Sequence, residues 1–346
     1  MHATLDTYNA GVTEIQDSAA LERRATEYAQ RIAGLREELS RSVIGQDAII
    51  EDLLVGLLAG GHVLLEGLPG LGKTLLVRSL AASLGMEFGR IQFTPDLMPT
   101  DVVGTRIIDE TKQNLSFRFE PGPIFANVVL ADEINRTTPK TQSALLEAMQ
   151  EARVTVGDNT HALPRPFCVI ATQNPIELEG TYPLPEAQLD RFLFKLLVRA
   201  PAPQDLATIL DATTGPKTHD PRPNVLSAED VIEIQALVRQ ILCGQHLTRF
   251  VAELVHVTSP ESGVDESTAR SVRYGASPRA GQAIIIAAKV RALLDGRPSV
   301  SRHDLERSVR AALRHRIVFS FDAEGGEDAL DRLLPRWIEQ AEVRAG

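Results

Sequence analysis

The chain of 346 residues is 43% hydrophobic, 24% charged and 5% aromatic, a composition typical of a globular protein with about two domains. It has no run of 18 apolar residues, so we expect no transmembrane helix, and its N-terminus lacks the basic start and apolar run of a secretory signal. The net charge of −10 argues against general affinity for nucleic acid, and two cysteines without metal-ligand spacing, Cys168 and Cys243, favour a reducing, cytoplasmic location.

The N-terminal region is predicted to be helical. Residues 1–20 are polar with weak periodicity, so we expect them to be loosely ordered. Residues 21–40 place apolar side chains near one stripe, which indicates an amphipathic helix. A second, more apolar helix is predicted over residues 47–58, and a glycine pair ends it. We interpret residues 1–40 as an N-terminal helical extension that is partly disordered.

From residue 62 to about residue 200, short apolar strands alternate with helix-forming segments. This alternation predicts an α/β fold, with a parallel sheet and helices on both of its faces. The predicted strands are 62–65, 90–93, 127–131, 167–171 and 194–198, and the predicted helices are 74–84, 139–152 and about 186–192. Two segments interrupt the pattern and are interpreted as hairpin insertions: 105–119, with a tip around 109–114, and 154–161, with a turn at Gly157-Asp158-Asn159.

After residue 202 the pattern is helical. Pro221-Arg-Pro-Asn is typical of a linker, and helices follow that begin after Ser227, near Leu247, at Ser277-Pro278 and after Ser301, with a fifth over residues 327–343. We therefore predict an α/β core over residues 41–202 and a helical domain over residues 203–346.

The most informative segment runs from Gly67 to Thr74, because it fits the phosphate-loop pattern of Gly, four residues, Gly-Lys and Ser or Thr. A predicted strand precedes it and a predicted helix follows it, which aims backbone N–H groups and a helix dipole at an anion. Lys73 is expected to reach the β- and γ-phosphates, and the Thr74 hydroxyl is expected to bind Mg²⁺. The expected nucleotide contacts are Gly67, Pro69, Gly70, Leu71, Gly72, Lys73, Thr74 and Leu75.

Two acidic residues, Asp132 and Glu133, directly follow the apolar strand 127–131. Open α/β sheets bind ligands at the carboxyl ends of their strands, so these carboxylates are expected at the nucleotide. Asp132 fits a ligand that completes the Mg²⁺ shell with Thr74, and Glu133 fits the general base that activates water. Alone, this motif is weak and could be a surface pair, but downstream of a phosphate loop it is strong.

Asn174 ends another predicted strand and precedes Pro175. Its amide could orient a water molecule or contact the γ-phosphate. An asparagine before proline is also a common turn former, but the strand must lie near Asp132 in the sheet, which favours the functional interpretation.

Two arginines could stabilise the negative charge that phosphoryl transfer builds on the γ-phosphate. Arg279 lies in the first turn of a predicted C-terminal helix and could reach the nucleotide as that domain closes. Arg191 precedes the fifth strand and could point into the site of a neighbouring subunit. Each arginine taken alone would be interpreted as a surface ion-pair partner.

These segments together resemble the AAA+ ATPases, and within them the MoxR family, over about residues 41–340. The matching stretches, besides the phosphate loop, are Val43-Ile-Gly-Gln, Gln92-Phe-Thr-Pro-Asp-Leu-Met-Pro-Thr-Asp-Val-Val-Gly, Gly122-Pro-Ile-Phe-Ala-Asn, Ala131-Asp-Glu-Ile-Asn-Arg, Ala171-Thr-Gln-Asn-Pro, Leu184-Pro-Glu-Ala-Gln-Leu-Asp-Arg-Phe and Ala276-Ser-Pro-Arg-Ala. Residues 1–40 lie outside the match.

The resemblance implies an AAA+ core with a five-stranded parallel sheet in the order 5-1-4-3-2, two β-hairpin insertions, and an all-helical lid domain. It implies ATP/ADP and Mg²⁺ as cofactors, with Ile44 and Gly45 lining the adenine pocket. It also implies a homo-oligomer in the form of a hexameric ring.

By the same resemblance, Asn174 is the first sensor, Arg279 is the lid sensor and a nucleotide contact, and Arg191 is the trans-acting arginine finger. Arg136 is a second candidate for contact across the subunit boundary. Proteins of this kind are thought to be chaperone-like ATPases that mature complexes or insert metal cofactors, often with a von Willebrand factor A-domain partner. The sequence does not name the partner or the client protein.

Three other functions use the same core: a nucleic-acid motor, a magnesium-chelatase-like motor subunit, and a nucleotide switch that barely hydrolyses. Residues 270–316 hold eleven Arg or Lys and three Asp or Glu, which could form a nucleic-acid surface. Basic groups near a triphosphate, or facing an acidic neighbouring subunit, explain them as well, and we favour that interpretation. The hairpin tips are acidic or polar, which also makes nucleic-acid binding the weaker hypothesis.

Overall fold

The computed structural model describes residues 2–109, 116–176, 180–215, 221–320 and 328–346. The chain forms two compact units, one made of Met1–Gly34 with Glu233–Gly346 and the other of Leu35–Ile232. The division predicted from the sequence, with boundaries after residues 40 and 202, stays a prediction.

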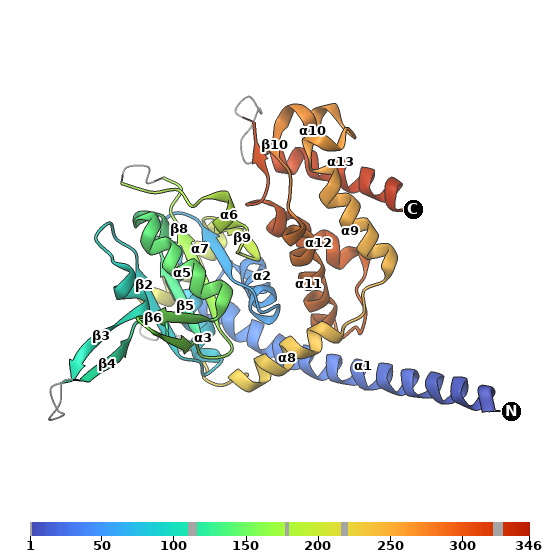
Figure 1. Cartoon of the computed structure of the whole chain (residues 1–346), viewed down its shortest axis with the longest axis horizontal. Coiled ribbons are helices and arrows are strands. Elements are labelled where there is room, and N and C mark those ends of the chain that lie inside the picture. The colour runs from blue at the N-terminus through green and yellow to red at the C-terminus, as the bar shows by residue number, and fades with distance from the viewer. Residues whose placement is uncertain (1, 110–115, 177–179, 216–220, 321–327) are drawn as a thin grey trace. The chain divides into compact units, whose positions relative to one another are not determined.

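The unit Leu35–Ile232 is built on a five-stranded parallel sheet (Figure 1). Its strands lie in the order β2-β5-β8-β1-β9, and every neighbouring pair is parallel. Counted along the chain among themselves, the five strands have the predicted order 5-1-4-3-2, which is confirmed. Their bounds are β1 Val63–Glu66, β2 Phe88–Gln92, β5 Val128–Asp132, β8 Cys168–Gln173 and β9 Phe194–Leu197.

Helices cover both faces of this sheet. The connection through α3 (Lys73–Ser83) crosses the sheet in one direction, and the connections through α4 (Pro99–Val103) and α5 (Pro139–Glu151) cross it in the other. Because such crossovers are right-handed, α3 lies on one face and α4 and α5 lie on the opposite face. Three further helices of this unit are α2 (Asp47–Leu58), α6 (Glu186–Leu189) and α7 (Pro203–Thr214).

The core under α5 is apolar and closed. Leu64 and Val129 of the sheet pack against Leu145 and Met149 of α5, and the exposed fraction of each is at most 5%. Burial on this scale is the main favourable free-energy term that holds the strand ends in place, and the candidate site lies at those ends.

Two antiparallel hairpins are inserted into this core, as predicted. The first is formed by β3 (Gly104–Asp109) and β4 (Ser116–Pro121), and the second by β6 (Arg153–Val156) and β7 (Asn159–Ala162). The tip predicted for the first hairpin lies outside the described residues from residue 110 onward.

The other unit is helical, as predicted for the C-terminal domain. Its helices are α9 (Gln245–Val257), α10 (Glu266–Ser271), α11 (Pro278–Leu294), α12 (Arg302–Leu313) and α13 (Asp328–Ala345), while α1 (His2–Ser42) and α8 (Ala228–Gln240) each contribute to both units. One addition is a short antiparallel pair between β10 (Val272–Tyr274) and β11 (Val318–Phe319). No helix among the described residues combines the length and apolar character that a membrane span requires.

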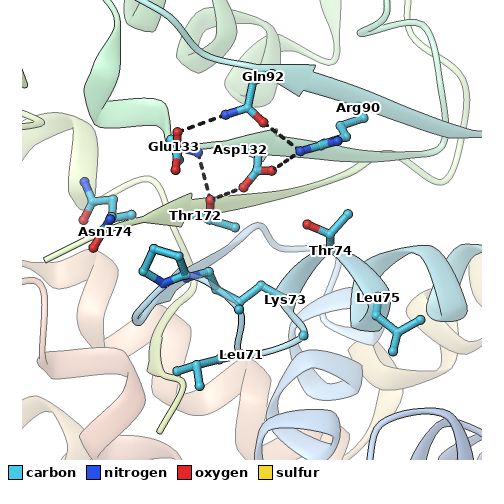
Figure 2. Close-up of a pocket in the computed structure, with 14 residues that line it drawn as sticks. Leu71, Lys73, Thr74, Leu75, Arg90, Gln92, Asp132, Glu133, Thr172 and Asn174 are labelled. Atoms are coloured by element: carbon cyan, nitrogen blue, oxygen red, sulfur yellow. Dashed lines mark hydrogen bonds and ion pairs between the residues drawn. The ribbon is translucent and has the colours of Figure 1, made fainter. Parts of the chain in front are cut away.

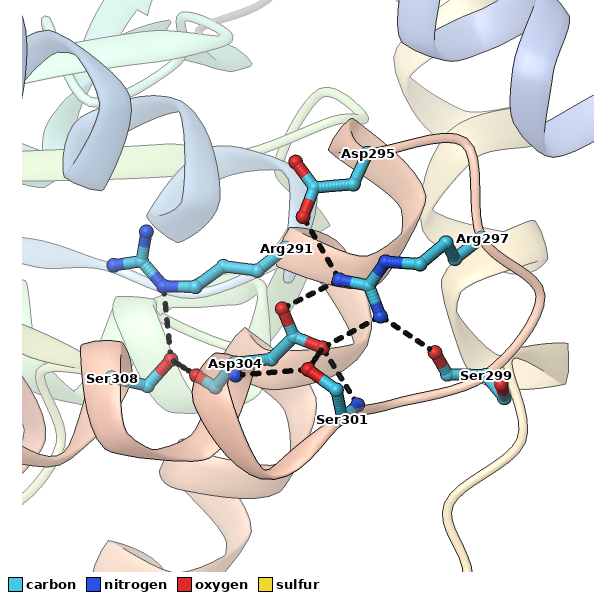
Figure 3. Close-up of polar contacts among 7 residues, drawn as sticks. All are labelled: Arg291, Asp295, Arg297, Ser299, Ser301, Asp304 and Ser308. Atoms are coloured by element: carbon cyan, nitrogen blue, oxygen red, sulfur yellow. Dashed lines mark hydrogen bonds and ion pairs between the residues drawn. The ribbon is translucent and has the colours of Figure 1, made fainter.

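A polar cluster fixes the turn from α11 to α12 (Figure 3). The guanidinium of Arg297 donates hydrogen bonds to both oxygens of Asp304, at 2.7 and 3.0 Å, and Ser301 and Asp304 form the expected capping box at the start of α12. Burial alone would raise the pKa of the Asp304 carboxyl, but the hydrogen bonds from Arg297 and Ser301 hold that pKa below its usual value. The pair therefore stays ionised at neutral pH.

Candidate functional site

The loop between β1 and α3 has the backbone of a phosphate loop. Gly70 and Gly72 have φ angles of +81° and +76°, in the left-handed region that favours glycine, and Gly72 directly precedes α3. The Lys73 ammonium donates hydrogen bonds to the carbonyl oxygens of Gly67 and Leu68, the latter at 2.9 Å. Burial lowers the pKa of Lys73, and the nearby carboxylates of Asp132 and Glu133 oppose that effect.

This loop forms one wall of a cavity of about 460 Å³ (Figure 2). The opposite wall is made by the carboxyl ends of β2, β5 and β8, as expected for a ligand site in an open α/β sheet. The cavity is lined by residues 69–75 and by Arg90, Gln92, Asp132, Glu133, Thr172, Gln173 and Asn174. The structure therefore brings together Lys73, Thr74, Asp132, Glu133 and Asn174, which the sequence singled out separately.

Thr172 positions both acidic residues. Its hydroxyl donates a hydrogen bond to Asp132 Oδ1 at 2.7 Å and accepts one from the Glu133 backbone N–H at 2.8 Å. The side chain of Thr172 is buried. A single residue of β8 thus sets the relative placement of the two carboxylates at the end of β5.

Glu133 has an unusual backbone and a constrained side chain. Its φ of 58° and ψ of 50° lie in the left-handed region, which residues other than glycine seldom adopt. Its Oε2 accepts hydrogen bonds from Gln92 Nε2 at 3.0 Å and from Arg136 Nη1 at 2.9 Å. The backbone turn directs the carboxylate to the cavity, and two donors from neighbouring segments hold it there.

Asn174 forms a turn and also lines the cavity. Its Oδ1 accepts a hydrogen bond from the Ile176 backbone N–H at 3.2 Å, which is the turn-forming contact. The residue nevertheless lines the cavity beside Glu133. The turn therefore orients the asparagine at the site instead of removing it from the site.

A second, more apolar cavity of about 620 Å³ shares Gly70, Leu71, Gly72 and Leu75 with the first. Ile44 lines it, as do Leu206 and Ile209 of α7. Sequence reasoning missed α7, although its apolar residues recur at helical spacing. Gly45, expected in the same pocket as Ile44, lies against α7: a Cβ built on it would come within 2.8 Å of the Asp205 carboxyl carbon.

The two arginines predicted to contact the nucleotide belong to different units of the described structure. Arg191 lines a separate cavity of about 210 Å³ next to α5, where its Nη1 donates to the Leu146 carbonyl at 2.6 Å. Its buried Nε has no hydrogen-bond partner among the residues that the structure describes. Arg279 lies in the first turn of α11, in the other unit. Its contact with nucleotide stays a prediction.

The donor set of the first cavity suits Mg²⁺. The hydroxyl of Thr74 and the carboxylate of Asp132 are hard oxygen ligands that line the same space. Among the residues that the structure describes, no group of three or more His, Cys, Asp or Glu side chains could hold a metal by itself. A magnesium ion here would therefore draw its remaining ligands from water and phosphate, as it usually does in nucleotide sites.

This sheet order, phosphate loop and acidic strand end define a P-loop ATPase of the AAA class. The AAA model, described as "ATPase family associated with various cellular activities", matches residues 62–194, and an AAA lid domain model matches residues 265–334. The chain is 44% identical over 305 residues to Chaperone MoxR1 of Mycobacterium tuberculosis, covering 87% of this chain and 79% of that protein. It belongs to the MoxR family of AAA+ ATPases.

Two further relatives agree with this assignment. Protein MoxR of Paracoccus denitrificans is 32% identical over 343 residues, which cover 93% of this chain and 97% of that one. A crystal structure of a candidate ATPase from Cytophaga hutchinsonii matches with a TM-score of 0.86 and 38% identity, covering 94% of this chain and 98% of that chain.

Proposed function

We propose that this protein is an ATP-hydrolysing MoxR-type chaperone that remodels or matures partner protein complexes. The observation that carries the proposal is the convergence of Lys73, Thr74, Asp132, Glu133 and Asn174 on one cavity. Phosphoryl transfer needs little covalent help from the protein; it needs positioned charges and a positioned water, and these residue types supply both.

Each side chain has a role that follows from its place. The loop N–H groups and Lys73 bind the β- and γ-phosphates, while Thr74 and Asp132 hold Mg²⁺, which neutralises charge developing on the phosphates. Glu133 accepts the proton of the attacking water, and Asn174 orients that water. Glu133 Oε2 already accepts two hydrogen bonds, so Oε1 is the oxygen of the carboxylate that is left to accept a proton from water.

The second cavity supplies a site for the base. Ile44, Leu71 and Leu75 offer apolar side chains next to the phosphate loop, which suits a planar heteroaromatic ring. We assign adenine to this cavity, so that ATP spans both cavities across their shared loop.

We further propose that the chain acts as a homo-oligomer, a hexameric ring in which Arg191 completes the neighbouring site. Arg191 lies outside the proposed nucleotide cavity of its own chain, and its buried Nε has no partner in the described part of the chain, which supports action in trans. Arg279 is the proposed lid sensor, supported by its place in the first turn of α11.

The first hairpin is the proposed contact for other proteins. It extends away from the core (Figure 1), and its opposed residues Ile108 and Phe117 have exposed fractions of 53% and 64%. Exposed apolar pairs of this kind suit a polypeptide partner better than a phosphate backbone, and the second hairpin carries Asp158 at its turn. A von Willebrand factor A-domain partner and metal-cofactor insertion are proposed from the family resemblance.

The hydrolysis proposal is tested by comparing ATP turnover of the wild type, Glu133→Gln and the matched control Glu87→Gln, whose exposed residue directly precedes β2. Glu133→Gln should lose at least about 100-fold in turnover and still bind ATP, because it removes the base and keeps the shape. Glu87→Gln should match the wild type. Equal and barely detectable turnover of Glu133→Gln and wild type would favour the nucleotide switch, and equal, substantial turnover would contradict the role of Glu133 as base.

The chaperone proposal is tested with the same variant. Glu133→Gln loaded with ATP should retain client and partner proteins that the ADP form releases. Turnover measured with and without DNA at moderate salt is the second arm, and clear stimulation by DNA would favour the nucleic-acid motor instead.

A further inference from the structure

Among the described residues that line the first cavity, Arg90 is the one cation that the proposed mechanism does not use. It lies on β2, with its backbone opposite Leu130 of β5, and its side chain is 49% exposed. Its Nη2 donates hydrogen bonds to Asp132 Oδ2 at 2.8 Å and to Gln92 Oε1 at 2.7 Å (Figure 2). Nη2 of Arg90 therefore links Asp132, the proposed metal ligand, to Gln92, which donates a hydrogen bond to Glu133.

The two oxygens of Asp132 are not equivalent. Oδ1 accepts a hydrogen bond from the buried hydroxyl of Thr172. The same hydroxyl accepts a hydrogen bond from the backbone N–H of Glu133. Oδ2 is the oxygen that remains for a cation at the cavity, and Arg90 holds it. A guanidinium and a divalent ion at the same oxygen repel each other, so both cannot keep full contact with it.

We propose that Arg90 is the internal counter-cation of the metal site: it neutralises Asp132 while no magnesium is bound and gives up Oδ2 when Mg²⁺ arrives with the nucleotide. This inference rests on the proposed nucleotide site. The half-exposed side chain has room to move, and its hydrogen bond to Gln92 Oε1 can persist after it leaves Asp132. Arg90 is thus a positioning residue, since it acts through Asp132 and not on the reacting atoms.

Two opposite effects follow. Without metal, Arg90 reduces the repulsion between the Asp132 carboxylate and a polyphosphate, so it favours metal-free nucleotide binding. With metal, Arg90 competes for Oδ2, so it lowers the affinity for Mg²⁺. The quantity that reports both effects is the ratio of the Kd for ATP in EDTA to the Kd for ATP in Mg²⁺.

The experiment measures this ratio by equilibrium binding of ATP to the full-length wild type, Arg90→Ala, Arg90→Lys and the control Arg153→Ala. Arg153 is an exposed arginine of β6 that pairs with Glu151, so its variant loses the same charge away from the site. The ratio should rise by at least about threefold in Arg90→Ala, which corresponds to the free energy of a half-exposed ion pair. It should stay at the wild-type value in Arg153→Ala. Arg90→Lys keeps the charge and should lie between the wild type and Arg90→Ala.

A second readout measures the metal directly. Binding of Mn²⁺ in the presence of ADP, followed by electron paramagnetic resonance, should be tighter in Arg90→Ala than in the wild type. If Arg90 instead binds phosphate, both Kd values for ATP weaken together, the ratio is unchanged and Mn²⁺ binding is not tightened; that result overturns the proposal. Should Arg90→Ala not fold, an unchanged ratio in Arg90→Lys overturns it equally.

Failure of this inference can be told from failure of the proposed function. A wild-type chain that binds no ATP in Mg²⁺ contradicts the nucleotide site itself. A wild type that binds ATP normally, with variant ratios unchanged, contradicts only the role of Arg90.

Discussion

Arg136 Nη1 donates a hydrogen bond to Glu133 Oε2 of the same chain at 2.9 Å. An arginine that already holds the proposed base of its own chain is poorly placed to serve a neighbouring subunit of the proposed ring. Arg191, in contrast, lies outside the nucleotide cavity of its own chain. The two arginines that the sequence offered for contact across the subunit boundary therefore differ in their surroundings.

Mixing inactive variants separates these two roles. Arg191→Ala and Glu133→Gln should each be inactive alone, but mixed subunits should regain turnover, because about a quarter of the interfaces then pair an intact base with an intact arginine. Arg136→Ala mixed with Glu133→Gln should regain none, since both defects affect the same base. Turnover of one-to-one mixtures is the measurement, and rescue by Arg136→Ala would instead make Arg136 the trans-acting group.

Thr172 offers a test of how the acidic pair is held. Thr172→Val keeps the shape but leaves Asp132 Oδ1 and the Glu133 N–H without their partner, at a cost of about 1–3 kcal/mol for each buried group. We expect turnover to fall at least about tenfold, with a smaller loss in ADP affinity, because the defect concerns the water and metal positions. Thr172→Ser retains the hydroxyl and should keep most of the turnover; equal losses in both variants would contradict the hydrogen-bond argument.

His62 predicts a pH dependence of stability for the unit Leu35–Ile232. Its Nε2 donates to the Met149 carbonyl and its Nδ1 accepts from the Val169 N–H, both at 3.0 Å, so the folded protein needs the neutral ring. Burial lowers the pKa of His62 from 6.5 to about 4. Above pH 6.5 the ring is neutral in both states, and as the pH falls from 6.5 towards 4 only the unfolded chain takes up the proton, so the free energy of unfolding decreases, by up to about 3 kcal/mol.

The measurement is urea unfolding of the wild type and His62→Gln, followed by circular dichroism at about pH 7.5 and about pH 5. The variant should be less stable at the higher pH and should lose less on acidification. A parallel loss in both proteins would show that other groups carry the pH dependence.

The cluster of Arg297 and Asp304 predicts a loss of stability confined to the other unit. Arg297→Ala leaves a buried carboxylate without its ion pair and should lower the free energy of unfolding by about 2–3 kcal/mol. The single tryptophan, Trp337, is fully buried in the same unit and its Nε1 donates to Thr268 Oγ1 at 2.8 Å, so its fluorescence reports this unfolding. The control Arg332→Ala, at an exposed side chain, should change the free energy of unfolding by less than about 0.5 kcal/mol.

The sequence predicted the fold and predicted that the main candidate site residues would lie together, because the information for both is local. A loop motif sets the phosphate site, and polar residues directly after buried strands must meet at one edge of a parallel sheet. Arg90 and Gln92 were not assigned to the site, although the alternation with buried Ile91 and Phe93 places them both on one face of β2. That alternation was the signal available in the sequence.

Other features depend on the assembled fold. The wall that α7 contributes to the second cavity, and the contact of Gly45 with Asp205, arise only when segments about 160 residues apart meet. The left-handed backbone of Glu133 likewise has no signal in its residue type, because glutamate seldom adopts it. The ion pair between Arg136 and Glu133 forms across that turn.

The contact of Lys73 with the carbonyl oxygens of Gly67 and Leu68 bears on how a product leaves. A partly buried ammonium deprived of all oxygen partners would cost several kcal/mol, and a departing nucleotide would have to supply that free energy. The carbonyls of this loop give the Lys73 ammonium oxygen partners that belong to the protein itself. In the proposed ATPase cycle, release of the product would therefore not require the nucleotide to supply that free energy.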